Sequence, residues 1–194
     1  MIALIDYGAG NTASVSNILK ELNADYLLTN NKKDIESADK IILPGVGEAS
    51  SAMKRLEELD LIESLKSSSK PFFGICLGMQ LLCESTEEGN SKCLGIIPIV
   101  VEKFIRKDLK VPHMGWNSIK KINSDDLFLN TAKHEYFYFA HSYFVRQNEF
   151  TTSTCNYGLD FSASLRCKNF YGVQFHPEKS SQQGIRIIKN FLKI

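Results

Sequence analysis

The sequence predicts an α/β fold in which a parallel core sheet is extended by antiparallel strands. In the first half of the chain, short apolar runs alternate with segments of helical periodicity, the pattern of a parallel sheet covered by helices. Past Glu88 the pattern changes to short β-rich runs between turns, which favours antiparallel pairing. Since a chain of 194 residues has the usual size of one domain, we expect residues 1–194 to form a single domain.

The first half is expected to begin with a strand, a turn and a helix. Residues 2–6 form a short apolar run that stops at YGAGN, and Val15, Ile18 and Leu19 follow at helical spacing. The remaining strands of this half are expected at residues 26–29, 40–43 and 72–75, and the helices at residues 53–59 and 61–66 and across CLGMQLLCEST, which begins at Cys76. Ligands of such sheets bind at the carboxyl ends of the strands.

The second half contains four β-rich runs and one helical segment. The β-rich runs are residues 96–105, 137–145, 161–165 and 170–175. Only residues 182–193 have the period of a long amphipathic helix. We therefore expect antiparallel strands to be added to the parallel core, with one closing helix.

The composition is that of an ordinary globular protein without a nucleic-acid footprint. Hydrophobic residues make up 43% of the chain, and 23 basic side chains against 22 acidic ones give a net charge of +1. The N-terminal run MIALIDYGAGN has no basic leader and meets Asp6 after five residues, so it predicts a strand and not a signal peptide or membrane span. We expect a cytoplasmic protein that binds neither membranes nor nucleic acid.

The cysteine pattern indicates reduced thiols. The five cysteines form an odd set without CxxC spacing, in a chain long enough to fold without disulfides or a zinc site. They are Cys76, Cys83, Cys93, Cys155 and Cys167.

Cys76 differs from the other cysteines because it lies between two glycines at the end of a predicted strand. Gly74, Cys76 and Gly78 form the pattern G-x-C-x-G. In hydrolases with serine at its centre, the glycines relieve crowding around a strained turn that exposes the nucleophile. A helix N-terminus favours the reactive thiolate, and exposed backbone N–H groups could bind a developing oxyanion. The alternative is a buried packing cysteine, the usual state of a free thiol.

His176 is the best candidate for the acid and base that a thiolate nucleophile needs. In YGVQFHPEKS it follows an apolar strand, and Pro177 favours an extended backbone. Because residues i and i+2 of an extended segment share a face, Glu178 can orient the His176 ring as the third member of a triad does. The alternative is a surface histidine beside a turn proline. The other histidines are His113, His134 and His141.

PGVG at residues 44–47 is another turn at the end of a predicted strand. Its glycines permit positive φ, so a peptide N–H here could turn toward the site as a second oxyanion donor. Most Pro-Gly turns only reverse the chain, which is the alternative for this one.

Together, GICLGMQ, QFHPE and PGVG resemble the class I (triad) glutamine amidotransferases. Five longer motifs narrow the resemblance to the HisH family, the glutaminase subunits of imidazole glycerol phosphate synthase in histidine biosynthesis. They are DYGAGN at 6–11, PGVGEA at 44–49, VPHMGWN at 111–117, FAHSY at 139–143 and FHPEKS at 175–180. The resemblance runs from residue 1 to the C-terminal helix and implies a flavodoxin-like three-layer fold.

The resemblance also implies roles for individual residues. The triad would be Cys76, His176 and Glu178, with Val46 and Leu77 as backbone oxyanion donors. The residues implied to border the glutamine pocket are Gly47, Gln80, Glu88, His141, Ser142 and Tyr143. Those implied to face a partner are Asn11, Met114, Trp116, Tyr138 and Lys179. For the single tryptophan, the alternative is a core aromatic that covers the sheet edge.

The implied reaction is hydrolysis of glutamine to glutamate and ammonia through a cysteinyl thioester, with no metal or organic cofactor. The implied partner is a HisF-type (βα)8-barrel cyclase, which forms a heterodimer with this subunit and uses the ammonia to make imidazole glycerol phosphate and AICAR. A peptide near PGVG is thought to flip in this family when the partner's ligand binds. We therefore expect the isolated chain to hydrolyse glutamine slowly.

Three other functions remain open from the sequence. A HisH-like subunit can also supply ammonia to a surface-sugar amidotransferase. The glutaminase subunit contacts only glutamine and the docking surface of its partner, so its own chemistry does not specify the ammonia acceptor. A cysteine peptidase or γ-glutamyl hydrolase would use the same triad without the partner-facing motifs. A flavodoxin-like binding module has little support, because YGAGN is not G-x-G-x-x-G and the chain has no Walker motif.

Overall fold

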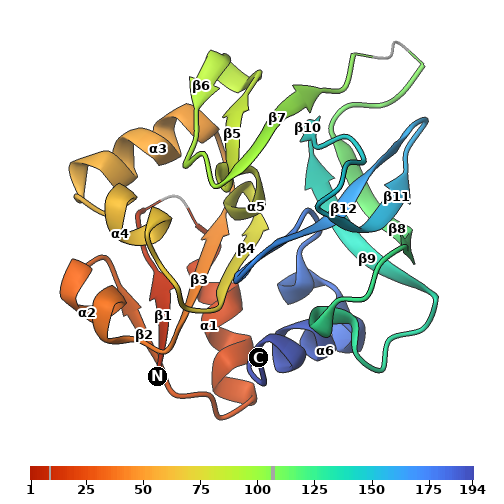
Figure 1. Ribbon diagram of the computed structural model, residues 1–194. Helices are drawn as coiled ribbons and strands as arrows, with labels where there is room; N and C mark the ends of the chain where they lie inside the picture. The colour runs from red at the N-terminus through yellow and green to blue at the C-terminus, as the bar shows by residue number, and fades with distance from the viewer. Residues whose placement is uncertain (9, 106–107) are drawn as a thin grey trace.

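The computed structural model describes residues 1–8, 10–105 and 108–194, so Ala9 of the DYGAGN motif lies outside the described residues. Figure 1 shows a large twisted sheet that runs through the molecule, with a smaller sheet above its middle in this view. The first half of the chain forms, in order, β1 (Ile2–Ile5), α1 (Thr12–Glu21), β2 (Tyr26–Thr29), α2 (Lys32–Ser37), β3 (Lys40–Gly45), α3 (Ala49–Glu58), α4 (Ile62–Lys66), β4 (Phe72–Cys76) and α5 (Leu77–Leu81).

The second half is mostly strand. Its elements are β5 (Cys83–Thr86), β6 (Ser91–Lys92), β7 (Ile97–Lys103), β8 (His113–Lys121), β9 (His134–His141), β10 (Tyr143–Phe144), β11 (Thr151–Asn156), β12 (Asp160–Cys167), β13 (Phe170–Val173) and α6 (Ser181–Phe191). Short 3-10 turns occur at Glu88–Asn90 (η1), Asp126–Phe128 (η2) and Pro177–Lys179 (η3).

The large sheet has the order β2-β1-β3-β4-β13-β12-β11-β8-β9. Its strands from β2 to β13 are parallel, and the four strands beyond β13 pair antiparallel. A second sheet has the order β10-β7-β5-β6. The predicted α/β fold, a parallel core with added antiparallel strands, is confirmed.

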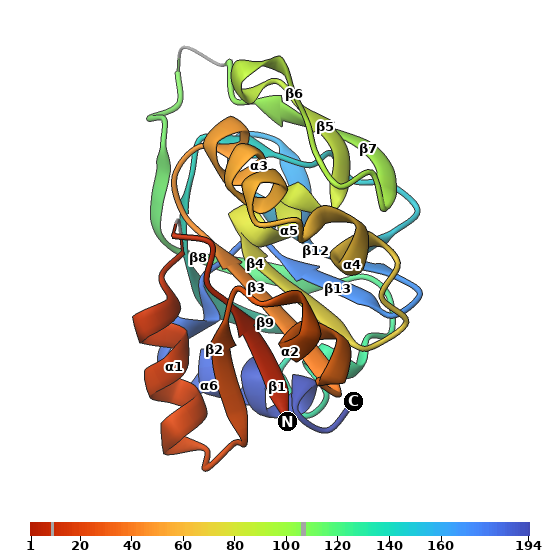
Figure 2. The same cartoon turned by 90° about the vertical axis from the view of Figure 1, so that its left-hand side faces the viewer.

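Helices cover both faces of the parallel strands β1, β3 and β4, whose successive residues are nearly all apolar and buried. Leu4 and Ile42 pack on one face with α1 and α6, while Ile5 and Leu43 pack on the other with α3. Figure 2 shows the two helical layers on opposite sides of the sheet. Fully covered parallel strands carry continuous apolar runs, which explains why the sequence signals them clearly.

The helix predicted across CLGMQLLCEST is wrong in its second half. Helix α5 ends at Leu81, and Cys83–Thr86 form β5, which pairs with β6 and β7. A short apolar run fits a buried strand as well as a buried helix, and here the second sheet supplies strand partners. The run predicted at 137–145 is likewise divided at Ser142, where the chain passes from β9 in the large sheet to β10 in the small one.

Besides the two-residue β6, the longer strands β8 and β11 were not predicted, because neither contains a continuous apolar run. Strand β11, TTSTCN, is buried at five of its six positions although none of its residues is aliphatic, and its hydroxyls pair with those of β12. Ser162 Oγ lies 2.8 Å from Thr151 Oγ1, and Ser164 Oγ lies 2.6 Å from Ser153 Oγ. Strand β8, HMGWNSIKK, is buried at His113 and Ile119 and is half-buried or exposed at its other positions. Within the described ranges, no helix has the length and apolar character needed to cross a membrane.

Candidate active site

Cys76 occupies a strained turn between β4 and α5. Its backbone has φ 53° and ψ −107°, which an L-residue rarely adopts and which the surrounding fold must hold in place. A Cβ on Gly78 would lie 1.9 Å from the Leu43 carbonyl oxygen, and one on Gly74 would lie 2.6 Å from the Gly78 carbonyl oxygen. The G-x-C-x-G glycines therefore allow α5 to lie directly against β3 and β4.

His176 and Glu178 follow β13. This strand pairs with one edge of β4, and β3 pairs with the opposite edge. The extended backbone of His176 (φ −99°, ψ 96°) is continued by η3, which starts with Pro177. His176 Nδ1 lies 2.7 Å from Glu178 Oε1, and the two side chains are only 2% and 1% exposed. Because a carboxylate only accepts, Nδ1 carries the proton, which leaves Nε2 as the second reactive nitrogen of the ring.

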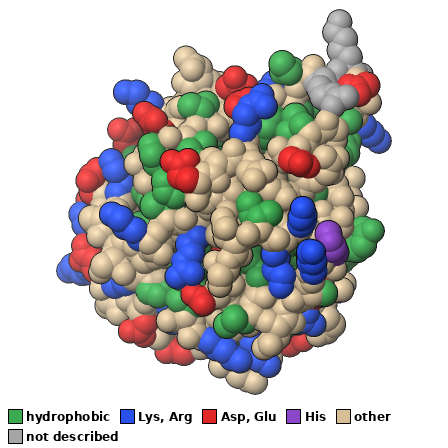
Figure 3. Space-filling model, turned by 45° about the vertical axis from the view of Figure 1, so that its right-hand side comes forward, with side chains coloured by type: hydrophobic (Ala, Val, Ile, Leu, Met, Phe, Trp, Pro, Cys, Tyr) green, Lys and Arg blue, Asp and Glu red, His purple; other side chains and the backbone are tan. Residues whose placement is uncertain are grey.

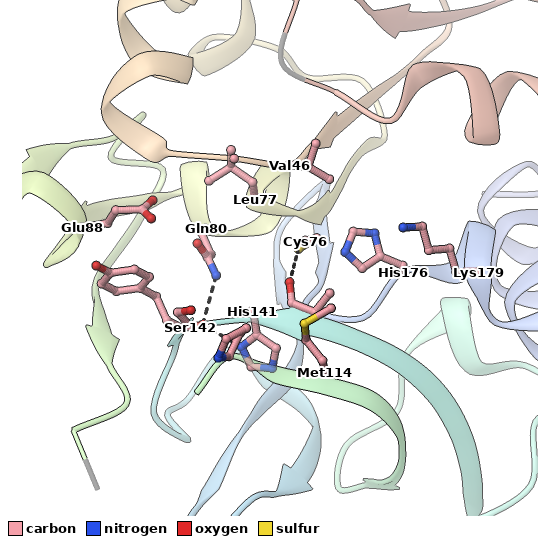
Figure 4. Close-up of a pocket in the computed structure, with 14 residues that line it drawn as sticks. Val46, Cys76, Leu77, Gln80, Glu88, Met114, His141, Ser142, His176 and Lys179 are labelled. Atoms are coloured by element: carbon pink, nitrogen blue, oxygen red, sulfur yellow. Dashed lines mark hydrogen bonds between the residues drawn. The ribbon is translucent and has the colours of Figure 1, made fainter. Parts of the chain in front are cut away.

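Cys76 and His176 line the same cavity, as Figure 4 shows. Burial alone would lower the pKa of His176, but the neighbouring Cys76 sulfur and the Glu178 carboxylate outweigh it and raise that pKa to about 10. The charged imidazolium is thus the favoured form of the His176 ring. The three side chains predicted as a triad are brought together from positions 100 residues apart.

The cavity has a volume of about 310 Å³. Every residue predicted for the glutamine pocket and for the oxyanion donors lines it. Those lining residues are Val46, Gly47, Leu77, Gln80, Glu88, His141, Ser142 and Tyr143. Gly47 has φ +95°, the positive φ expected of the PGVG turn. Met114 and Lys179, predicted for the partner face, also line the cavity, together with Pro112 and Ala140.

The wall of the cavity is fixed by hydrogen bonds from two side chains. Gln80 Nε2 lies 3.1 Å from the Tyr143 carbonyl oxygen and 2.9 Å from Gln174 Oε1. Glu88 Oε2 accepts from the Ala49 backbone N–H at 2.7 Å, and burial raises the pKa of the Glu88 carboxyl. These bonds attach η1 to the start of α3 and attach α5 to the chain after His141.

His141 belongs to a chain of buried neutral groups whose protons can be assigned. Asn117 Nδ2 donates to His113 Nε2 at 3.3 Å, so His113 carries its proton on Nδ1 and donates to His141 Nε2 at 3.0 Å. His141 Nδ1–H then donates to the Tyr143 carbonyl oxygen at 2.7 Å. Burial lowers the pKa of His113 to about 4 and that of His141 to about 3, which keeps both rings neutral.

The residues predicted for a partner face divide into two groups. Met114 and Trp116 are 63% and 50% exposed, so Trp116 is not a core aromatic. The Trp116 ring lies edge-on to Tyr138 at 6.3 Å, and Lys179 Nζ lies 5.9 Å from the Tyr138 ring centroid. Asn11 instead points to the triad, with Nδ2 3.3 Å from Glu178 Oε1. In Figure 3, hydrophobic side chains form small separate groups among charges of both signs.

Sequence reasoning did not single out Gln174 or His113 as part of this region. Both are buried polar side chains whose partners lie far away in the sequence. Both residues occur in motifs that carry the family resemblance, Gln174 in QFHPE and His113 in VPHMGWN. The hydrophobic pattern of the sequence does not distinguish them from other polar residues.

The fold and the site define a class of thiol-dependent α/β enzymes with cysteine, histidine and carboxylate at the carboxyl ends of parallel strands. The sequence matches the family described as "Glutamine amidotransferase class-I" over residues 3–194. The chain belongs to this family and, within it, to the HisH subunits of imidazole glycerol phosphate synthase.

The relatives match over their whole length. "Imidazole glycerol phosphate synthase subunit HisH" of Bacteroides fragilis (strain YCH46) is 48% identical, with 100% of this chain and 99% of the relative covered. The subunit of the same name from Mannheimia succiniciproducens is 44% identical, with 98% of each covered. Among solved structures, "Crystal structure of glutamine amidotransferase" has TM-score 0.77 at 19% identity, covering 100% of this chain and 98% of that one. "Structure of PurLQS from Thermotoga maritima" has TM-score 0.71 at 18% identity, covering 99% and 97%. The two structures support the fold alone.

Proposed function

We propose that this enzyme hydrolyses glutamine to glutamate and ammonia through a γ-glutamyl thioester on Cys76, and that the ammonia passes to a HisF-type cyclase. The observation that carries the proposal is the arrangement of Cys76 and His176 around one cavity, with Glu178 Oε1 2.7 Å from His176 Nδ1. A glutaminase needs a nucleophile, a proton carrier and a group that orients that carrier, and these side chains have those chemistries.

In the first half of the reaction, the Cys76 thiolate attacks the side-chain carboxamide carbon of glutamine. The carbonyl electron pair moves to oxygen, and the oxyanion is held by backbone N–H groups of Leu77 and of the peptide at Val46. When the intermediate collapses, the C–N bond breaks and His176 Nε2–H protonates the departing ammonia. The raised pKa of His176 supports this step, because the ring is charged before attack.

In the second half, neutral His176 takes a proton from water, which attacks the thioester carbon. Glutamate leaves, and the sulfur departs as the thiolate beside the imidazolium. Glu178 keeps the proton on Nδ1 throughout, so Nε2 alone exchanges protons with the reacting groups. Asn11, which also contacts Glu178 Oε1, helps to fix that carboxylate.

The cavity suits glutamine as the substrate. The residues in its walls include Gly47, Gln80, Glu88, Ser142 and Tyr143, which supply backbone and side-chain polar groups for an amide and an amino acid. Both ring nitrogens of His141 are engaged inside the protein, so His141 shapes the wall and holds Tyr143. We assign these residues to glutamine binding.

The partner is proposed to cover the rim of the cavity, because ammonia released into neutral water is protonated and lost as a nucleophile. Met114 and Lys179 both line the cavity and are exposed, and Trp116 is exposed on the same strand as Met114. Exposed aromatic side chains are frequent hot spots of protein interfaces. A HisF-type (βα)8 barrel docked here as a heterodimer would receive ammonia directly from Cys76.

The test is an assay of the chain purified with its cyclase, with glutamine or ammonium as nitrogen source. Cys76→Ala should abolish glutamine-dependent imidazole glycerol phosphate synthesis and leave ammonium-dependent synthesis intact. Cys93→Ala is the matched control and should leave both activities unchanged. Retained glutamine-dependent synthesis in Cys76→Ala would refute the proposal, and failure of every form to act with the cyclase would point to another ammonia acceptor.

A further inference from the structure

Gln174 is a fully buried polar residue that contacts the Cys76 sulfur. It lies directly after β13, two residues before His176, and its side chain is 0% exposed. Gln174 Nε2 lies 3.7 Å from Cys76 Sγ, and Gln174 Oε1 lies 2.9 Å from Gln80 Nε2. An uncharged amide is thus held against the reacting atom.

The orientation of the Gln174 amide follows from its neighbours. The Tyr143 carbonyl oxygen can only accept, so Gln80 presents its Nε2 to that oxygen at 3.1 Å. The same Gln80 nitrogen faces Gln174, which must therefore present Oε1. The remaining Gln174 atom, Nε2, then points an N–H at the sulfur. The reverse orientation would oppose two N–H donors in a buried site and leave both without acceptors.

A buried thiolate needs donors to remain ionised. Cys76 is only 5% exposed, so water does little to solvate its sulfur. An N–H donor favours the charged form of an acceptor over the neutral form, and hydrogen bonds to ionised groups are stronger than those to neutral ones. The donor also fixes the direction of the sulfur lone pairs before attack.

We propose that Gln174 is a further catalytic residue, whose Nε2–H donates to the Cys76 thiolate and holds the nucleophile ionised and aimed into the glutamine cavity. No bond to Gln174 forms or breaks. As the sulfur attacks, its negative charge moves to the substrate oxygen and the Gln174 bond weakens. This inference rests on the proposed role of Cys76 as the nucleophile.

The other groups around the sulfur set the background for a test. Among the described residues, the titratable groups that interact with Cys76 are His176, backed by Glu178, and Tyr7. The other titratable side chains that line the cavity are Glu88, His141, Tyr143 and Lys179. Burial raises the pKa of Tyr7, whose hydroxyl donates to the Pro44 carbonyl oxygen, so it stays neutral. The side-chain hydrogen bonds of Gln174 go to Gln80 and Cys76, so a substitution at Gln174 leaves each of these titratable groups in place.

The test measures the rate of alkylation of Cys76 by iodoacetamide as a function of pH, followed by mass spectrometry of the peptide that carries Cys76. Gln174→Met keeps the shape of the side chain and removes the donor, and the pH at half-maximal rate should rise by about one unit. Gln174→Glu keeps the acceptor for Gln80 and puts negative charge against the sulfur, so its midpoint should rise further. Gln182→Met, an exposed position on α6, is the matched control and should not move the midpoint.

A packing role predicts something different: slower turnover in both variants with an unchanged alkylation midpoint, which would overturn the proposal. If a variant does not fold, an NMR titration of the unsubstituted protein tests the proposal instead. The Gln174 side-chain amide resonances should shift with the same pH midpoint as the alkylation rate. Amide resonances that do not shift over this pH range would also overturn the proposal. Alkylation needs neither glutamine nor the cyclase, so this result stands apart from the outcome of the glutaminase assay.

Discussion

Acidification from pH 7 to pH 5 should destabilise this protein through His113 and His141. Both rings are buried and neutral, and each would oppose an N–H to a neighbouring N–H if it gained a proton. Their folded pKa values are about 4 and 3, against 6.5 for an unfolded histidine. Between pH 7 and pH 5 the unfolded chain therefore binds protons that the folded chain does not. Each histidine costs about 1.8 kcal/mol over this range, roughly 3.5 kcal/mol for the pair.

The sign of this effect distinguishes it from that of His176. The folded pKa of His176 lies above its unfolded value, so its stabilisation is fully present below pH 6.5 and is lost as the pH rises toward 10. The stabilisation from neutral His113 and His141 is present above pH 6.5 and is lost as the pH falls toward their folded values. Of these three histidines, only His113 and His141 destabilise the fold as the pH falls below 6.5.

The assay is urea unfolding at pH 7 and pH 5 for the unsubstituted chain, His113→Phe and the control His134→Phe. Phenylalanine keeps the stacking of residue 113 on Phe139 and Tyr157 but cannot titrate. His113→Phe should be less stable at pH 7, because His141 Nε2 loses its donor, yet it should lose about 1.8 kcal/mol less on acidification. His134 is exposed, so its replacement controls for the loss of a histidine that is not packed in the core. Equal losses in all three proteins would refute the assignment of buried neutral rings.

Three further predictions concern the turn, the triad and the partner face. Gly78→Ala should cost about 3 kcal/mol or more of unfolding free energy, because its Cβ would overlap the Leu43 carbonyl oxygen; an unchanged urea midpoint would contradict the close packing. Glu178→Gln should lower glutamine turnover on the order of 10² to 10⁴-fold, by removing the charge that orients His176, and unchanged turnover would exclude that role. Trp116→Ala should weaken cyclase binding by about 2 kcal/mol in calorimetry while alkylation of the nucleophile stays the same; equal affinity would remove it from the interface.

The parts of the fold that the sequence predicts well are those with a repeated local signal. The parallel strands β1, β3 and β4 carry continuous apolar runs because helices cover both of their faces. The edge strand β2 also falls at the predicted residues 26–29, although its two leucines are exposed. Strand β11 was missed because its hydroxyls satisfy one another across a sheet, and no period in TTSTCN reveals such pairing. Helix α5 was predicted too long because partners from β7 decide the state of Cys83–Thr86.

The residues of the site also fall into those that a local sequence pattern marks and those that it does not. Cys76 and His176 are marked locally, one by flanking glycines and the other by its place between a strand and a proline. Gln174 and His113 have no such marks, since their importance depends on contacts with residues 98 and 28 positions away. Long-range hydrogen bonds between buried polar side chains are a property of the packed structure, which local patterns do not report.

The most direct test of the thioester chemistry is rapid quenching of the enzyme–cyclase complex during turnover of labelled glutamine, followed by mass spectrometry of the digested chain. A γ-glutamyl group should be found on the peptide that contains Cys76, and it should disappear when the label is chased with unlabelled glutamine. Label on another cysteine, or turnover without any acylated peptide under conditions that preserve thioesters, would contradict the role assigned to this sulfur.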